Sequence, residues 1–292
     1  MGQTLGRTQG ARYVHEPDGD HDAFAFRARR GCAPNPVLRP GDPAPDWERL
    51  WQGVFAGGHD ATSPRARAAR YLYAKTPVAD RWESWLGGRT SARLQVVSEL
   101  AVPRDGTGAE RVVAKSVRAA FAVEWIAARF APQVVVVERN PLNVLSSWIT
   151  LDFLNDSRQL QMLADHSSST WGVPAPPAGA PRLVQQAFSV GVLMSALRDA
   201  ARRHPEWHVV RHEDLCIDSE RKYRALVEHL GLVWADSVTE FLADSDAEGE
   251  GYETKRPTSS QPDRWRELLD ANAVATIQST LAPFPYALVP EP

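Results

Sequence analysis

Four consecutive valines at residues 134–137 constrain the fold more than any other feature of the chain. A short β-branched run of this kind is typical of a strand that is buried on both faces of a parallel sheet. Asn140 follows as a candidate N-cap and Pro141 as a candidate first helical residue, so a helix is predicted to begin there. The apolar residues that come next recur at helical spacing. Residues 134–148 are therefore predicted to form a strand that leads directly into a helix.

Arg139 lies on the predicted turn between this strand and this helix. The first N–H groups of a helix have no partner within it, and the N-terminal end carries partial positive charge, so we expect an anion site here. Ser147, seven residues after Asn140, returns to the same side of the helix two turns later. Arg139 and Ser147 are predicted to hold one phosphate together. In a simpler interpretation, Arg139 pairs with Glu138 or Glu213 at the sheet edge.

The composition excludes several classes of protein. A chain of 292 residues with 43% hydrophobic and 24% charged residues is ordinary for a globular domain with a substantial core. A net charge of −3 creates no field that would draw the chain to nucleic acid or an anionic membrane, and we expect neither partner. Cys32 and Cys216 form no disulfide framework, and the first residues lack the apolar core of a signal peptide. We expect a cytoplasmic protein whose oligomeric state the sequence does not reveal.

Strands and helices are predicted to alternate along the chain. Strands are expected at residues 12–14, 111–115, 134–137 and 207–210, and helices at 47–54, within 71–85, at 120–130, 141–148, 183–201 and 223–230, with one last helix across 265–281. This order predicts a single α/β domain over residues 1–292, built around a short parallel sheet flanked by helices. Residues 18–45 are predicted to be a loop, and residues 151–181 a mobile excursion.

Polar side chains follow the predicted strands at the point where each one ends. They are His15 and Glu16, Lys115, Arg139, and the group His212, Glu213 and Asp214. Ligands of doubly wound sheets bind at the carboxyl ends of the strands. We therefore expect these groups to meet at one crevice that holds an anionic ligand and activates a nucleophile.

The motifs also resemble those of a known family. Arg139-Asn-Pro, with Ser147 eight residues after Arg139, resembles the 3′-phosphate-binding motif of sulfotransferases that use 3′-phosphoadenosine 5′-phosphosulfate (PAPS). The motifs at residues 13–17, Lys115, 211–215 and 255–265 fall in the order seen in bacterial members. The resemblance spans essentially the whole chain. It implies a P-loop-like three-layer fold and transfer of a sulfuryl group from PAPS to a hydroxyl or amine of a small-molecule or carbohydrate acceptor.

The resemblance also implies roles for individual residues. Glu16 resembles the catalytic glutamate of the carbohydrate-modifying branch and would be the base, with His15 as its rival. Lys115 would stabilise charge on the bridging oxygen, although a solvated strand-end lysine is the simpler interpretation. Lys255 and Arg256 resemble a C-terminal nucleotide-binding segment, but a solvated pair would look the same.

Two family features are absent from the sequence. The Ser-Gly-Thr/Ser-Thr-Trp loop that grips the 5′-phosphosulfate has no counterpart, and residues 2–6 resemble the helix that follows that loop. Cytosolic animal members keep a catalytic histidine two residues after a lysine, where this chain has Val117. A valine cannot accept a proton, and in this respect the chain resembles the carbohydrate-modifying branch, whose catalytic base is a glutamate, more than the cytosolic animal members.

The chemistry of sulfuryl transfer agrees with these roles. Like phosphoryl transfer, it proceeds in line through a loose transition state, so positioning and cationic stabilisation do most of the work. The acceptor alcohol needs a base within hydrogen-bond reach. A glutamate in a partly desolvated crevice can serve, because desolvation raises the pKa of a carboxyl group. A sulfuryl group carries less charge than a phosphoryl group, so no metal is predicted.

Other interpretations stay open at this stage. A sulfotransferase fold that binds the nucleotide without transferring sulfate is one, and a P-loop phosphotransferase is another, although no Gly-x-x-x-x-Gly-Lys-Ser/Thr motif is present. The acidic run at residues 18–22 suggests a metal loop, but a solvated turn is the preferred interpretation. Trp47, Trp51, Trp82 and Trp85 either line an acceptor pocket or belong to the core.

Overall fold

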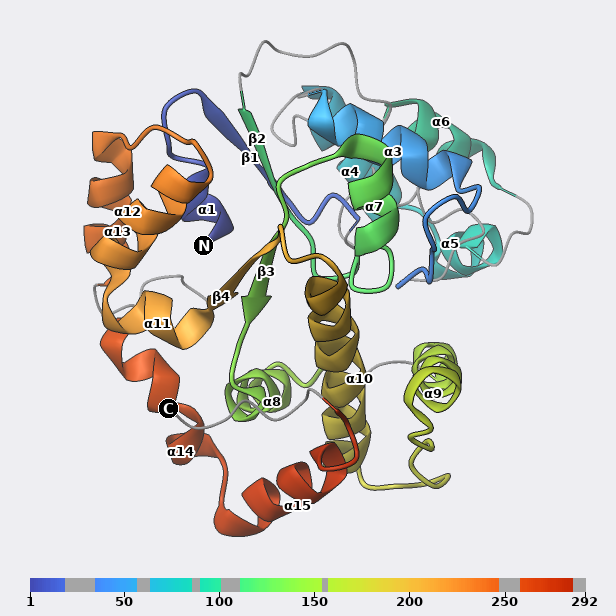
Figure 1. Cartoon of the computed structure of the whole chain (residues 1–292). Coiled ribbons are helices and arrows are strands. Elements are labelled where there is room, and N and C mark those ends of the chain that lie inside the picture. The colour runs from blue at the N-terminus through green and yellow to red at the C-terminus, as the bar shows by residue number, and fades with distance from the viewer. Residues whose placement is uncertain are drawn as a thin grey trace. The chain divides into compact units, whose positions relative to one another are not determined.

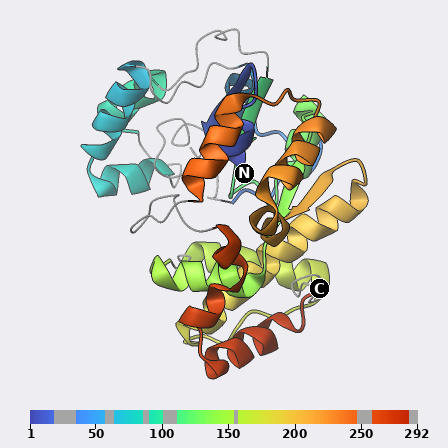
Figure 2. The same cartoon turned by 90° about the vertical axis from the view of Figure 1, so that its left-hand side faces the viewer.

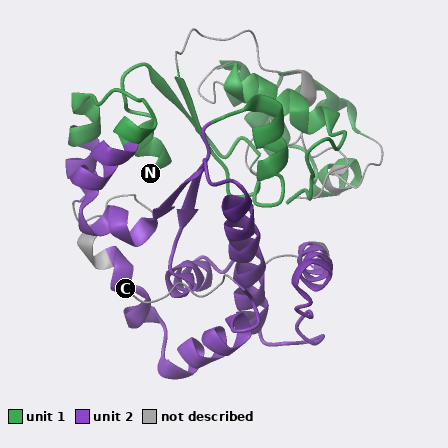
Figure 3. Cartoon of the chain, viewed as in Figure 1, with its two compact units in different colours: residues 1–132, 227–239 green, residues 133–226, 240–292 purple. Residues whose placement is uncertain are grey.

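A computed structural model of the chain describes residues 1–18, 35–56, 64–85, 90–100, 111–153, 157–246 and 258–285. The chain divides into two compact units, of which unit 1 comprises residues 1–132 and 227–239, and unit 2 comprises residues 133–226 and 240–292 (Figure 3). Lys255 and Arg256 lie outside the described residues, as do residues 19–34 of the predicted loop. No helix in the described ranges is long and apolar enough to cross a bilayer.

Unit 1 contains a two-stranded parallel sheet of β1 (Ala11–His15) and β2 (Arg111–Lys115), which confirms both predicted strands (Figure 1). Their register pairs His15 with Lys115, so both strands end at the same edge. The helices of unit 1 are α1 (Gly2–Leu5), α3 (Pro45–Phe55), α4 (Pro64–Ala74), α5 (Val78–Trp85), α6 (Ala92–Leu100) and α7 (Val123–Phe130).

The core of unit 1 forms around α3. Its buried side chains follow the predicted helical spacing: Trp47, Leu50, Trp51 and Val54. Val14 of β1 and Trp125 of α7 belong to the same apolar cluster. Burying one such large side chain stabilises the fold by about 1.5–3 kcal/mol. Trp47 and Trp51 are thus core residues, whereas the side chains of Trp82 and Trp85 lie outside the described part.

Unit 2 contains a second parallel sheet, formed by β3 (Val135–Glu138) and β4 (His208–Arg211). Its helices are α8 (Pro141–Thr150), α9 (Ser157–Trp171), α10 (Arg182–Arg203), α11 (His212–Ile217), α14 (Trp265–Leu268) and α15 (Ala271–Leu281), with the 3₁₀ helix η1 (Thr258–Asp263). The long helix α10 packs against α8, α9 and α15 (Figure 2). Two helices, α12 (Ser219–His229) and α13 (Asp236–Ser245), contain residues of both units.

The sheets confirm a mixed α/β protein but not the single short sheet that the sequence predicted. Within the described ranges, the strands form two separate two-stranded sheets, one in each unit. Each of these strands thus pairs with one other strand among the described residues. The valine run is not buried on both faces, because Val137 is 38% exposed. The sequence indicates where strands begin and end, whereas pairing depends on contacts between distant residues.

Two local predictions were wrong. The excursion predicted at residues 151–181 contains α9, in which the buried Ser167 donates its hydroxyl to the backbone of Val173 at 2.9 Å. The single last helix is two helices, because Leu269 is extended and Asp270 caps α15 by accepting from the N–H of Ala273 at 2.7 Å. The structure also contains a helix that the sequence did not predict, α11, which begins at His212 directly after β4.

Candidate functional site

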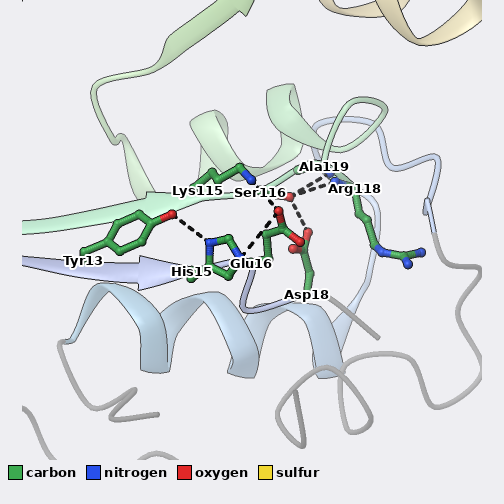
Figure 4. A network of polar contacts seen from close by, with 8 residues as sticks. All are labelled: Tyr13, His15, Glu16, Asp18, Lys115, Ser116, Arg118 and Ala119. Atoms are coloured by element: carbon green, nitrogen blue, oxygen red, sulfur yellow. Dashed lines mark hydrogen bonds and ion pairs between the residues drawn. The ribbon is translucent and has the colours of Figure 1, made fainter. Parts of the chain in front are cut away.

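Four side chains gather where β1 and β2 end in unit 1, and we call them the strand-end cluster: Tyr13, His15, Glu16 and Lys115 (Figure 4). Lys115 Nζ donates to Glu16 Oε1 at 2.5 Å. The N–H of Glu16 donates to the carbonyl of Lys115 at 2.8 Å, so the strand pairing extends one residue further on the β1 side. The structure therefore brings together the two residues that the sequence singled out as base and cation.

The backbone at Glu16 is unusual. Its φ of 41° lies in the left-handed region, which costs an L-residue about 1–2 kcal/mol. The side chains of Glu16 and Lys115 are 27% and 41% exposed, so water screens their attraction. An ion pair of this kind adds little to stability. The contact thus sets the direction of the carboxylate more than it holds the fold together.

His15 lies near the same carboxylate oxygen of Glu16. Its Nε2 lies 3.9 Å from Glu16 Oε1, and its Nδ1 lies 2.8 Å from the Tyr13 hydroxyl. Burial raises the pKa of Tyr13 to about 12, and the negative charge of Glu16 adds to this shift. The phenol therefore stays protonated at neutral pH. It shares a hydrogen bond with His15 Nδ1, and which of the two atoms donates depends on the tautomer of the imidazole ring.

Sequence reasoning missed Tyr13. A signal was available, since residues two apart on a strand point to the same face. Tyr13 is also closely packed by the turn after α1, where a Cβ added at Gly6 would lie 2.4 Å from the Tyr13 Cβ. A side chain at Gly6 would displace the phenol that orients His15.

The residue after β2 connects this edge to the loop that follows β1. Ser116 Oγ donates to Asp18 Oδ2 at 2.6 Å and accepts from the N–H groups of Arg118 and Ala119 at 3.1 and 3.0 Å (Figure 4). Asp18 lies in a turn but is fully buried and not solvated, and the rest of the predicted solvated turn, residues 19–22, lies outside the described residues. Among the described residues, no group of three or more His, Cys, Asp or Glu side chains gathers as a metal site would require.

In unit 2, the turn between β3 and α8 contains Arg139, and we call residues 138–143 the Arg139 corner. The predicted cap is confirmed, because Asn140 Oδ1 accepts from the N–H of Leu142 at 2.9 Å and Pro141 is the first helical residue. The N–H of Asn140 donates to Glu213 Oε1 at 2.8 Å. The backbone N–H groups of Asn140 and Leu142, expected to be free for an anion, are therefore engaged, and Pro141 has none. A phosphate here would depend on side chains and on the charge of the helix end.

A bidentate ion pair fixes the start of this corner. Glu138 accepts from Arg198 of α10 at 2.6 and 2.7 Å, and both side chains are only 16% exposed. Arg139 follows at the end of β3, and Ser147 lies two turns along α8; both are partly exposed. Charge-assisted bidentate bonds of this kind are strong and directional. The corner is therefore anchored to α10 immediately before Arg139.

Two side chains of the neighbouring helix α11, those of His212 and Cys216, are neutral at pH 7. Burial lowers the pKa of His212 to about 4, and the positive charge of Arg139 adds to this shift. Burial also raises the pKa of Cys216 to about 11, with the negative charge of Glu213 adding to it. Cys216 Sγ lies 3.6 Å from His212 Nδ1, but a protonated thiol beside a neutral imidazole is a poor nucleophile. The residue of this helix that binds the Arg139 corner is Glu213, which accepts from the N–H of Asn140.

No protein-family model, curated protein or solved structure matches the chain.

Proposed function

We propose that the chain is a PAPS-dependent sulfotransferase with a P-loop-like fold, which acts on a hydroxyl of a small-molecule or carbohydrate acceptor. The observation that carries this proposal is the 2.5 Å contact between Glu16 and Lys115. Sulfuryl transfer needs a base for the acceptor hydroxyl and a cation for the leaving oxygen. A carboxylate and an ammonium group at the ends of two paired parallel strands supply both.

The two side chains divide the reaction between them. Glu16 accepts the proton of the acceptor hydroxyl while that oxygen forms its bond to sulfur. Lys115 stabilises the negative charge that develops on the bridging oxygen as the bond between sulfur and that oxygen breaks. The products are a sulfate ester and 3′-phosphoadenosine 5′-phosphate. The long, partly exposed side chain of Lys115 can leave Glu16 and turn to that oxygen.

The contact with Lys115 favours Glu16 over His15 as the base, because it places the Glu16 carboxylate directly beside the cation at the strand ends. His15 lies next to this carboxylate and shares a hydrogen bond with Tyr13.

The Arg139 corner supports the nucleotide half of the proposal. Since its first backbone N–H groups are engaged, the guanidinium of Arg139 and the hydroxyl of Ser147 are the groups that would contact the ribose 3′-phosphate. Guanidinium groups bind phosphate oxygens in bidentate fashion, and the N-terminal end of α8 adds favourable charge. Lys255 and Arg256 would add two more cations to the same nucleotide.

A thermal shift experiment tests the nucleotide half. We expect 3′-phosphoadenosine 5′-phosphate to raise the Tm more than ATP with Mg²⁺, since ligand at 100 times its Kd stabilises the folded state by about 2.7 kcal/mol. Arg139→Gln should abolish most of this shift. Arg182→Gln is the matched control, because Arg182 is an exposed arginine of unit 2 that pairs with Asp152. A larger response to Mg-ATP would favour a phosphotransferase instead.

Transfer of labelled sulfate from PAPS to a panel of alcohols tests the catalytic half. The proposal expects labelled product with at least one hydroxyl acceptor. Nucleotide binding without transfer to any of them would favour the binding-protein interpretation.

A further inference from the structure

A buried asparagine in α8 joins two parts of unit 2 that lie far apart in the sequence. Asn143 is 1% exposed and lies three residues after the N-cap Asn140. Its Nδ2 donates to the carbonyl of Pro262 at 2.7 Å, and its Oδ1 accepts from the N–H of Trp265 at 3.2 Å. Both ends of the amide are thus used on the backbone of one segment, residues 258–268, which we call the docked segment.

The docked segment consists of η1 and α14. Helix α14 contains no buried residue, and Leu268 is 47% exposed. A helix without buried side chains gains little from the hydrophobic effect. The two hydrogen bonds from Asn143 to the backbone therefore contribute to the attachment of this part of the segment.

The attachment lies beside the Arg139 corner. α14 packs against α8, and η1 packs against α11, the helix whose Glu213 binds the N–H of Asn140. The docked segment therefore contacts both helices that hold the corner. It also brings an aromatic ring and a guanidinium group, since Arg266 lies 4.4 Å from the centre of the Trp265 ring and pairs with Asp263 at 2.9 Å.

We propose that Asn143 is a positioning residue for the nucleotide, which fastens the docked segment beside Arg139 so that both contact one nucleoside bisphosphate. This proposal rests on the proposed function. Asn143 does not touch the ligand in this arrangement. Its amide acts through the segment that it holds.

The test compares Asn143→Ala with wild type by hydrogen–deuterium exchange and by titration with 3′-phosphoadenosine 5′-phosphate. We expect the amides within residues 262–269, where Pro262 has none, to exchange about tenfold faster without nucleotide, because removing two hydrogen bonds of ordinary strength lowers the local opening free energy. We also expect the nucleotide Kd to rise about tenfold. Ser146→Ala is the matched control, since Ser146 is a buried polar residue of α8 whose hydroxyl donates to a backbone carbonyl of the same helix. It should leave both quantities unchanged.

A second variant guards against a folding defect. Asn143→Asp keeps the acceptor for Trp265 but faces the Pro262 carbonyl with a second oxygen, so it should reproduce both effects of Asn143→Ala. Exchange in residues 262–269 at the wild-type rate in both variants would overturn the proposal. So would faster exchange with an unchanged Kd. A wild-type chain that binds no nucleotide would show that the proposed function itself is wrong, and the nucleotide role of Asn143 would fall with it.

Discussion

The strand-end cluster of unit 1 and the Arg139 corner of unit 2 are held in different ways. In the first, partly exposed side chains contact one another, as Lys115 contacts Glu16. In the second, shielded side chains bind backbone groups or form a bidentate pair, as Glu213 binds Asn140 and Glu138 binds Arg198. Solvent-screened pairs contribute little to stability, whereas shielded ones are costly to break. Substitutions in the strand-end cluster should therefore change turnover more than stability. Substitutions in the Arg139 corner should change stability first.

The largest expected effect is on turnover. Glu16→Gln should lower the rate of sulfate transfer by about 10²–10⁴-fold, because an amide cannot accept the proton of the acceptor. The free energy of unfolding should change by less than about 1 kcal/mol, since the pair is screened by water. Glu48→Gln is the matched control. It removes the exposed carboxylate of another ion pair of unit 1, which Glu48 forms with Arg129 and not with a residue of the strand-end cluster. Turnover equal to that of wild type would remove Glu16 as the base.

Breaking the pair between Glu138 and Arg198 should have the largest effect on stability. Glu138→Gln leaves a shielded guanidinium without its charge partner, which costs about 3 kcal/mol by urea unfolding. Adding Arg198→Met should recover part of this loss, since it removes the uncompensated charge. A loss no larger than that of Glu16→Gln would contradict the contrast between the two units.

The two regions should also respond to opposite ends of the pH scale. The pKa of His212 is lowered from 6.5 to about 4, so between these values the unfolded chain binds more protons and stability falls as the pH drops. The pKa of Tyr13 is raised from 10.0 to about 12, so the folded chain binds more protons there and stability falls as the pH rises. Each group contributes a slope of at most about 1.4 kcal/mol per pH unit.

Urea unfolding across the pH range measures both slopes. His212→Asn should flatten the acid side and leave the alkaline side unchanged, whereas Tyr13→Phe should do the reverse. An acid slope that persists in His212→Asn would show that another group controls it.

The smallest expected effect concerns the cap of α8. Asn140→Ala should cost about 1 kcal/mol of stability, as is usual for losing an N-cap. Asp270→Ala removes the corresponding cap of α15 and should cost about the same. Only the first should also weaken binding of 3′-phosphoadenosine 5′-phosphate, because Asn140 belongs to the Arg139 corner and Asp270 does not. Equal nucleotide affinities in the two variants would show that the cap of α8 does not contribute to the proposed nucleotide site.

Local signals account for what the sequence predicted correctly. The β-branched run, the cap at Asn140 and the proline at position 141 act within a few residues, so the strand and the start of α8 could be read directly. The same holds for α3, whose apolar stripe repeats at the helical period. Glu16 and Lys115 were expected to meet because both follow parallel strands, and the register confirms that the strands end together.

Long-range pairing accounts for what the sequence did not reveal. Nothing near Asn143 indicates that its amide binds residues about 120 positions later, and nothing near Asp18 indicates the hydroxyl of Ser116. The valine run was predicted to be buried on both faces, because the sequence shows that the run is hydrophobic but not which faces of the strand are covered. The helix α9 was missed because its serines favour loops in isolation, although tertiary contacts can override such weak preferences.

The backbone of Glu16 has a consequence for how this position tolerates replacement. Glycine and asparagine adopt a left-handed conformation more readily than glutamate, so either would relax the chain at this point. A screen that rewards only thermal resistance should therefore enrich them here and discard the carboxylate. Under the proposed function, glutamate at this position gives up some stability for a carboxylate that acts as the base, and such a trade of stability for activity is common at active sites.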